Sequence, residues 1–223
     1  MNKRQFTKIV CDTFNLGSIT PSIFCYRVDC ILMGMNLVKV PGRAGYKLFF
    51  SIYPLWRQTL KACLDYPLFL QSIADDKNMD YILPEDMNEN DVDRALHLYQ
   101  SQIPFNHSAD VSFIGLREFL QYSIAHDVNI KSNFVLQMKI YELLYGIALY
   151  RNDEDTANDI CKAISYNIMQ WDDQIFQYWY GDKREYLTRL MDFDSNRVNF
   201  LNNFLQNLAE PKVRKLPQFS FIS

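Results

Sequence analysis

A change in hydrophobic periodicity near residue 91 is the feature of this sequence that most limits what the chain can fold into. From about residue 91 to 208, apolar residues recur at helical spacing. Before that point, between Pro21 and Pro54, β-branched and aromatic residues form short runs of the kind found in strands. We therefore predict an α+β fold, in which a small N-terminal helix and an antiparallel sheet merge into a C-terminal helical bundle of about six helices.

The first third of the chain predicts one helix followed by strands. Phe6, Val10 and Phe14 recur at helical spacing, and Gly17 marks the end of that helix. Strands are expected at 23–28, 30–40 and 46–53 as an antiparallel meander. Both alternating sets of side chains in these strands are largely apolar, so we expect both faces of the sheet to be covered. A second helix is expected at 57–73, with an interruption at Pro67 as the open alternative.

The remainder predicts a series of helices with short connections, which is typical of antiparallel neighbours in a bundle. Their expected ranges are 92–103, 108–127, 132–151, 154–170, 173–191 and 195–208. N-cap residues, whose side-chain oxygens accept hydrogen bonds from the first helical turn, are expected at Ser108, Ser132, Asp153, Asp172 and Ser195.

A run of acidic residues from Asp75 to Asp93 is the clearest break in composition. We place the domain boundary there. Residues 1–74 form an α-β-β-β unit, 75–91 an acidic linker, 92–210 the helical bundle and 211–223 a tail. One continuous domain is the open alternative. Apolar residues alternate in the tail at Phe219 and Phe221, which fits either a closing strand or a loose end.

Composition places the protein among packed globular chains of the cytoplasm. Of its 223 residues, 48% are hydrophobic and 15% aromatic, which excludes a largely disordered chain. The five cysteines are odd in number and lack C-x-x-C spacing, so we expect reduced, mostly buried thiols. Polar residues interrupt the N-terminal segment, and no run approaches the 18 apolar residues of a membrane span. We therefore expect no membrane association.

Motifs of known chemistry are absent from the sequence. The three histidines, His97, His107 and His126, form no H-x-x-x-H or H-E-x-x-H pattern, so we expect ordinary surface or hydrogen-bonded side chains. No glycine-rich phosphate loop or G-x-S-x-G is present. The stretch that starts at Asp86 resembles a calcium loop but has Asp91 where that loop needs glycine. We predict no catalytic residue, no metal and no cofactor. An enzyme would need a deep polar pocket with perturbed carboxylates.

Charge is distributed unevenly along the chain and suggests two kinds of partner. Residues 1–75 hold nine Lys/Arg and four Asp/Glu, whereas residues 76–223 hold 14 and 22. The acidic part would steer a basic protein partner. The predicted contact residues are Asp75, Asp76, Asp80, Glu85, Asp86, Glu89, Asp91 and Asp93. The alternative is nucleic-acid binding by basic side chains that are interleaved with aromatic residues. These basic residues are Arg27, Lys39, Arg43, Lys47, Arg57 and Lys61.

One stretch, residues 141–164, looks like a tetratricopeptide-type helical hairpin, with small residues such as Gly146 and Ala157 where two helices approach closely. Together with residues 5–60 and the strand pattern Y-x-x-x-F-x-I from Tyr46 to Ile52, it resembles a loose class of uncharacterised bacterial domains. Some members of that class look like immunity proteins encoded beside secreted polymorphic toxins. The resemblance favours a binding protein. With the absence of catalytic motifs and the acidic second part of the chain, we expect a non-enzymatic protein that binds another protein and neutralises a toxin as an immunity protein does. The alternative is a nucleic-acid-associated factor of phage defence or of a mobile element.

Overall fold

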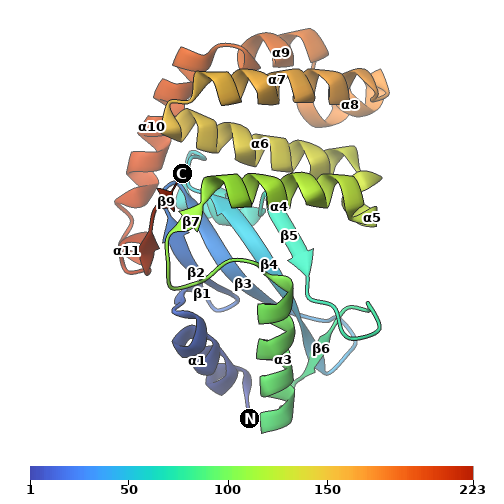
Figure 1. Cartoon of the computed structure of the whole chain (residues 1–223), viewed down its shortest axis with the longest axis vertical. Helices are drawn as coiled ribbons and strands as arrows, with labels where there is room; N and C mark the ends of the chain where they lie inside the picture. The colour runs from blue at the N-terminus through green and yellow to red at the C-terminus, as the bar shows by residue number, and fades with distance from the viewer. Residues whose placement is uncertain (223) are drawn as a thin grey trace. The chain divides into compact units, whose positions relative to one another are not determined.

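The computed structural model describes residues 1–222, which divide into two compact units (Figure 1). The first, here called the sheet unit, consists of Met1–Tyr53, Phe69–Phe113 and the chain from Ala209 onward. The second, the helical unit, consists of Pro54–Leu68 and Ile114–Leu208. This division differs from the expected one because the acidic stretch 75–91 is no linker. It contains strand β6 (Ile82–Pro84), which pairs with β4 (Gly45–Pro54).

The sheet unit is built on an antiparallel meander extended at both sides. Its path runs β1 (Gly17–Thr20), β2 (Ile23–Val28), β3 (Ile31–Lys39), β4 and β5 (Phe69–Ser72). Neighbouring β2 and β3 form a tight hairpin in which Val28 lies opposite Ile31. Asp29 occupies that turn with a φ of 46°, a backbone region that Asp tolerates better than most residues. The predicted fold class is confirmed, and the predicted strands at 23–28, 30–40 and 46–53 correspond to β2, β3 and β4.

The core of the sheet unit includes both faces of β3. All residues from Ile31 to Leu37 are buried, so side chains of both alternating sets are removed from water. Helix α1 (Lys3–Phe14) and helix α3 (Glu89–Gln102) meet through Phe14 and Tyr99, whose ring centroids are 5.2 Å apart (Figure 1). Each helix starts with a capping box, on Asn2 and Asn88 respectively, which satisfies backbone N–H groups of the first turn.

The C-terminal tail pairs with the sheet unit as strands. Of the two alternatives for the tail, a closing strand or a loose end, the closing strand is therefore correct. After the short helix α11 (Pro211–Arg214), strand β8 (Gln218–Phe219) pairs parallel with β2, and β9 (Phe221–Ile222) pairs parallel with β7 (Val111–Ser112). Side chains pin the tail as well. Asp29 accepts a hydrogen bond from the backbone N–H of Phe221 at 2.8 Å, and Asp110 accepts one from Ser220 at 2.8 Å.

The helical unit begins with α2 (Leu60–Asp65) and continues with α4 (Phe113–His126), α5 (Val128–Lys131), α6 (Phe134–Arg151), α7 (Glu154–Met169), α8 (Asp173–Tyr180), α9 (Lys183–Leu190) and α10 (Phe193–Leu208). The predicted hairpin at 141–164 is present as α6 and α7. Asn152 ends α6 in the left-handed conformation and Asp153 caps α7, so the chain reverses within two residues.

Two predicted helices are wrong in the structure. In the range 57–73 the interruption at Pro67 is present, because Tyr66 is extended ahead of the proline, but the residues after it form strand β5 and not a helix. The range 173–191 is broken into α8 and α9. Gly181 leaves the helix with a φ of 82°, and Asp182 starts the next one by accepting hydrogen bonds from the N–H groups of Arg184 and Glu185.

The expected N-caps are confirmed where the residue is Asp. Asp153 and Asp172 accept from the first-turn N–H groups of α7 and α8. The three expected Ser caps are wrong. Asn133 caps α6 while the Ser132 hydroxyl donates to a carbonyl, and α4 and α10 begin at Phe113 and Phe193, away from Ser108 and Ser195.

Candidate functional site

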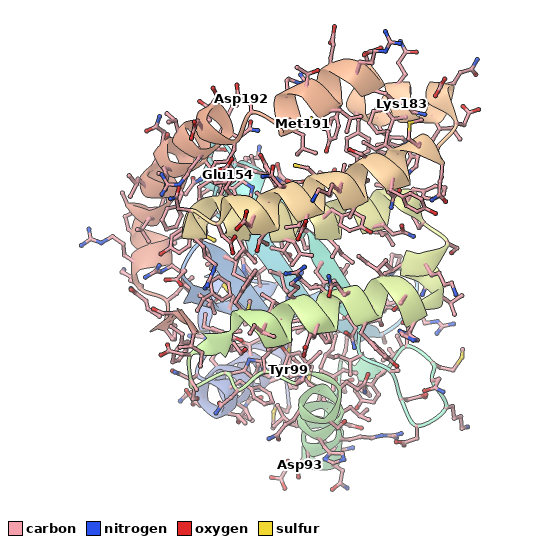
Figure 2. The ribbon with its side chains drawn as sticks, turned by 45° about the horizontal axis from the view of Figure 1, so that its top comes forward. Asp93, Tyr99, Glu154, Lys183, Met191 and Asp192 are labelled. Atoms are coloured by element: carbon pink, nitrogen blue, oxygen red, sulfur yellow. The ribbon has the colours of Figure 1, made fainter. Side chains whose placement is uncertain are left out.

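The acidic residues predicted to contact a partner are mostly engaged within the sheet unit. Asp75 accepts from the backbone N–H groups of Lys77 and Met79 in a turn, which holds its pKa below the usual value. Asp76, Asp80 and Glu85 form ion pairs, and Asp91 belongs to the capping box of α3. The remaining three are exposed: Asp86, Glu89 and Asp93, the last at the solvent side of α3 (Figure 2).

The basic residues predicted to contact nucleic acid are also largely engaged. Arg27 donates to the carbonyl of Asp29 and to the Gln218 side chain. Lys39 and Lys47 are ion-paired, whereas Arg43 is exposed. Arg57 and Lys61 belong to the helical unit, so the six do not form one group in the sheet unit. The interleaved aromatics Tyr26, Phe50 and Tyr53 are at most 3% exposed, which removes their faces from any stacking role.

The two predicted sets pair with each other. Lys39 binds Glu85, and Lys47 binds Asp80, so strands β3 and β4 neutralise two of the eight acids in residues 75–93. By the residues that belong to each unit, the sheet unit holds 12 Lys/Arg and 12 Asp/Glu, while the helical unit holds 11 and 14. The contrast between the first third of the sequence and the rest therefore disappears within the folded sheet unit.

His107 is the histidine that departs from expectation. His97 and His126 are exposed, but His107 is buried between the rings of Phe14, Tyr26 and Tyr99, at centroid distances of 5.2 to 5.5 Å. Among residues 1–222, its Nδ1 and the hydroxyls of Tyr26 and Tyr99 have no hydrogen-bond partner. Burial lowers the pKa of His107 to about 4, so the ring is neutral at physiological pH.

The part of the chain that the structure describes contains no cluster of side chains suited to bind a metal ion. Within residues 1–222, no group of three or more His, Cys, Asp or Glu side chains is arranged to hold a metal ion. Four of the five cysteines are buried, as expected, and all five are free thiols. Burial raises the pKa of the Cys161 thiol to about 11, which keeps it protonated and unreactive.

An exposed aromatic face on α8 is the most unusual surface of the helical unit. Ile175, Tyr178 and Trp179 follow the i, i+3, i+4 spacing of one helix face and are 56%, 82% and 57% exposed. The opposite face holds Phe176, which is fully buried against Trp171 and Tyr186. A rigidly anchored helix thus presents large apolar side chains to solvent, and we call this set the α8 face.

The segment that carries the α8 face is acidic, and a groove lies on another side of the same helix. Helices α7 and α8 with the turn between them, from Glu154 to Tyr180, carry five Asp/Glu and one Lys. A groove of about 650 Å³ lies on the Gln177 side of α8 and extends to Met169 and Leu187. Lys183, at the start of α9 (Figure 2), is one of the lining residues of this groove. Its Nζ donates to Asp173 and to the carbonyl of Trp171.

A separate cavity of about 390 Å³ is lined by α6, α9, α10 and the segment that carries Trp56. Its lining residues include Glu142, Arg189, Asn199 and Asn203. Burial raises the pKa of Glu142, and the charge of Arg57 opposes that rise. Such a set of groups can bind and orient a small polar molecule.

Sequence reasoning missed the α8 face although the pattern was available. The run from Asp173 to Tyr180 has large apolar residues at almost every position, so a helix there cannot bury all of them on one side. The break at Gly181 was the second missed signal, because it limits α8 to two turns and fixes which side is buried.

Searches of protein families, curated proteins and solved structures found no match to the chain. None of the helices in residues 1–222 is long and apolar enough to cross a membrane.

Proposed function

We propose that this chain is a non-enzymatic bacterial protein that binds a basic protein through the α8 face, in the manner of an immunity protein that neutralises a toxin. The observation that carries the proposal is the exposure of Tyr178 and Trp179 on a helix anchored from behind by Phe176. Tyr and Trp are the residues most enriched at the energetic centres of protein interfaces. Exposed large apolar groups of this kind mark binding surfaces.

Charge around the α8 face supports a basic partner. The span Glu154 to Tyr180 has a formal charge of −4, from its five acids and one Lys. Complementary charge raises the rate of association more than the final affinity, whereas buried aromatic anchors control dissociation. Engagement of the acids does not separate the two regions. Most acids at residues 75–93 are paired or capping, and near α8 Asp159 and Asp173 are paired while Asp172 caps the helix. The exposed aromatic side chains are what distinguish α8. We therefore place the proposed partner-binding surface on α8 and not on residues 75–93.

Native mass spectrometry of the tagged chain purified from its own host at low salt identifies the partner. The captured protein is then tested by surface plasmon resonance against the double variant Tyr178→Ala/Trp179→Ala. We expect a loss of affinity of about 30-fold or more, mainly through faster dissociation, because truncation of a central aromatic pair removes hot-spot contacts. If the partner is a toxin, co-expression with the native chain restores growth and co-expression with the double variant does not.

Two controls separate the α8 face from other surfaces. Tyr122→Ala removes a tyrosine that is 63% exposed on α4, and its affinity should equal that of the native chain. The triple variant Asp86→Asn/Glu89→Asn/Asp93→Asn removes the exposed acids of the sheet unit and should leave dissociation unchanged. Nucleic acid in place of a protein partner, or a partner that the double variant still binds with native affinity, would overturn the proposal.

A further inference from the structure

The cavity of the helical unit has an apolar wall that depends on a single glycine. A Cβ atom at Gly146 would lie 2.3 Å from the ring of Trp56, so only glycine lets this ring lie against α6. Trp56 also packs on Phe200 of α10, with ring centroids 5.1 Å apart. Leu149 and Leu190 extend this apolar surface. The sequence predicted that Gly146 serves the approach of α6 to α7, and the structure places it against Trp56 instead.

Glu142 supplies a negative charge to the cavity, and its neighbour Arg57 compensates that charge only weakly. Its Oε1 lies 3.6 Å from Nη2 of Arg57, a separation too long for a good hydrogen bond. The guanidinium of Arg57 is held elsewhere, since its Nη1 donates to the carbonyls of Ala62 and Tyr66 at 3.2 and 3.1 Å. The side chain of Glu142 is 43% exposed, and Glu142 is one of the lining residues, so its carboxylate keeps capacity to accept hydrogen bonds from a ligand.

Helix α10 and the end of α9 supply the complementary groups. Asn196, Asn199 and Asn203 recur at helical spacing and all line the cavity. The Nδ2 of Asn196 is used, because it donates to the Tyr145 hydroxyl at 3.0 Å. In the described part of the chain, the side chains of Asn199, Asn203 and Arg189 make no hydrogen bond, so they remain available to an anion or a carbonyl.

We propose that this cavity binds a small zwitterion with an apolar body, of the class of an α-amino acid with an aliphatic or aromatic side chain. The ammonium group lies at Glu142, the carboxylate lies at Arg189 and the amides of α10, and the body packs on Trp56 and Phe200. The lining carries one acid and one base, so a ligand with one charge of each sign is matched and a singly charged one is not. The N-terminal residue of a short peptide has the same ammonium group and apolar side chain as a free amino acid, so it is a second possible source of this ligand chemistry.

Isothermal titration calorimetry on the full chain tests the charge requirement directly. L-phenylalanine is compared with phenethylamine, which lacks the carboxylate, and with 3-phenylpropionate, which lacks the ammonium. We expect each analogue to bind at least about tenfold more weakly, because each leaves either Glu142 or Arg189 without its counter-charge. L-leucine and the dipeptide leucyl-leucine distinguish a free amino acid from a peptide end. Equal binding of all three phenyl compounds, or no binding of any amino acid or dipeptide, overturns the proposal.

Variants assign the binding to this cavity. Glu142→Gln and Arg189→Gln should each lower affinity for L-phenylalanine about tenfold, whereas Asn202→Ala, an exposed position of α10 outside the lining, should leave it unchanged. If Glu142→Gln does not fold, the comparison of the three phenyl compounds on the native chain decides alone. Adenosine monophosphate is the competing probe. Binding of this nucleotide without binding of amino acids would overturn the zwitterion class.

Discussion

The sheet unit and the helical unit use charged and aromatic side chains in opposite ways. In the sheet unit, Lys47 and Asp80 come from stretches 33 residues apart and pair, while the rings of Tyr26 and Tyr99 are fully buried. In the helical unit, Tyr178 and Trp179 are exposed, and Glu142 and Arg189 line a cavity. The difference teaches that a run of like charge in sequence predicts a binding surface only if its counter-charges are far away in the fold.

The strongest test of this contrast compares two neighbouring aromatics of α8. Phe176→Ala should destabilise the chain by about 3–5 kcal/mol, because a fully buried ring in contact with three other aromatic residues is lost. Tyr178→Ala should change stability by less than about 0.5 kcal/mol, since its side chain is exposed. Urea denaturation measures both. Similar losses for the two variants would show that the α8 face is structural.

Acidification tests the buried histidine of the sheet unit. The folded-state pKa of His107, about 4, lies below its ordinary value of 6.5, so protonation favours the unfolded chain. The contribution of neutral His107 to the free energy of unfolding is complete above pH 6.5 and is lost as the pH falls towards 4. This contribution amounts to about 3 kcal/mol. Denaturation midpoints across this range should fall more steeply for the native chain than for His107→Phe. His97→Gln, at an exposed position, should follow the native curve, and an identical slope for His107→Phe would refute the assignment.

Gly146→Ala sharpens the comparison inside the helical unit. The new methyl group would meet the Trp56 ring at 2.3 Å, and the resulting displacement should cost about 1–3 kcal/mol. Trp56 fluorescence should shift as the ring moves, although Trp171 and Trp179 contribute a constant background. Gly42→Ala is the contrasting case in the sheet unit, since nothing lies within 4 Å there and only its φ of 72° is unfavourable. An unchanged stability and spectrum for Gly146→Ala would mean that Trp56 does not form the wall of the cavity.

The smallest effect is expected for the ion pair that joins the two predicted charge sets. A double-mutant cycle on Lys47→Ala and Asp80→Ala should give a coupling energy below about 1 kcal/mol, because both side chains are partly exposed. The coupling should weaken with salt. Lys47 and Ser72 hold the pKa of Asp80 below its usual value, so this contribution is present above the ordinary pKa of Asp and is lost on acidification below it. No measurable coupling would mean that residues 75–93 remain free to attract a partner.

The sequence allowed the fold class, the central strands and most helices of the bundle to be predicted, because hydrophobic periodicity reports which side of an element is buried. It did not allow the short strands β5 and β6 to be predicted and left the tail strand β8 undecided, since each is fixed by pairing with a distant strand. The predicted sites failed for the same reason. Glu85 looks like part of a free acidic run until Lys39 is found beside it. The α8 face needed the break at Gly181 to be recognised.

The position of β8 has a consequence for synthesis of the chain. Arg27 of β2 meets Gln218 only after 191 further residues have been translated. The helical unit is complete once Leu208 has emerged from the ribosome, whereas the sheet unit still lacks its last strands at that moment. Although most of its strands are made first, the sheet unit is therefore the later of the two to finish. Until β8 arrives, the outer edge of β2 beyond β1 is open to pairing with other chains.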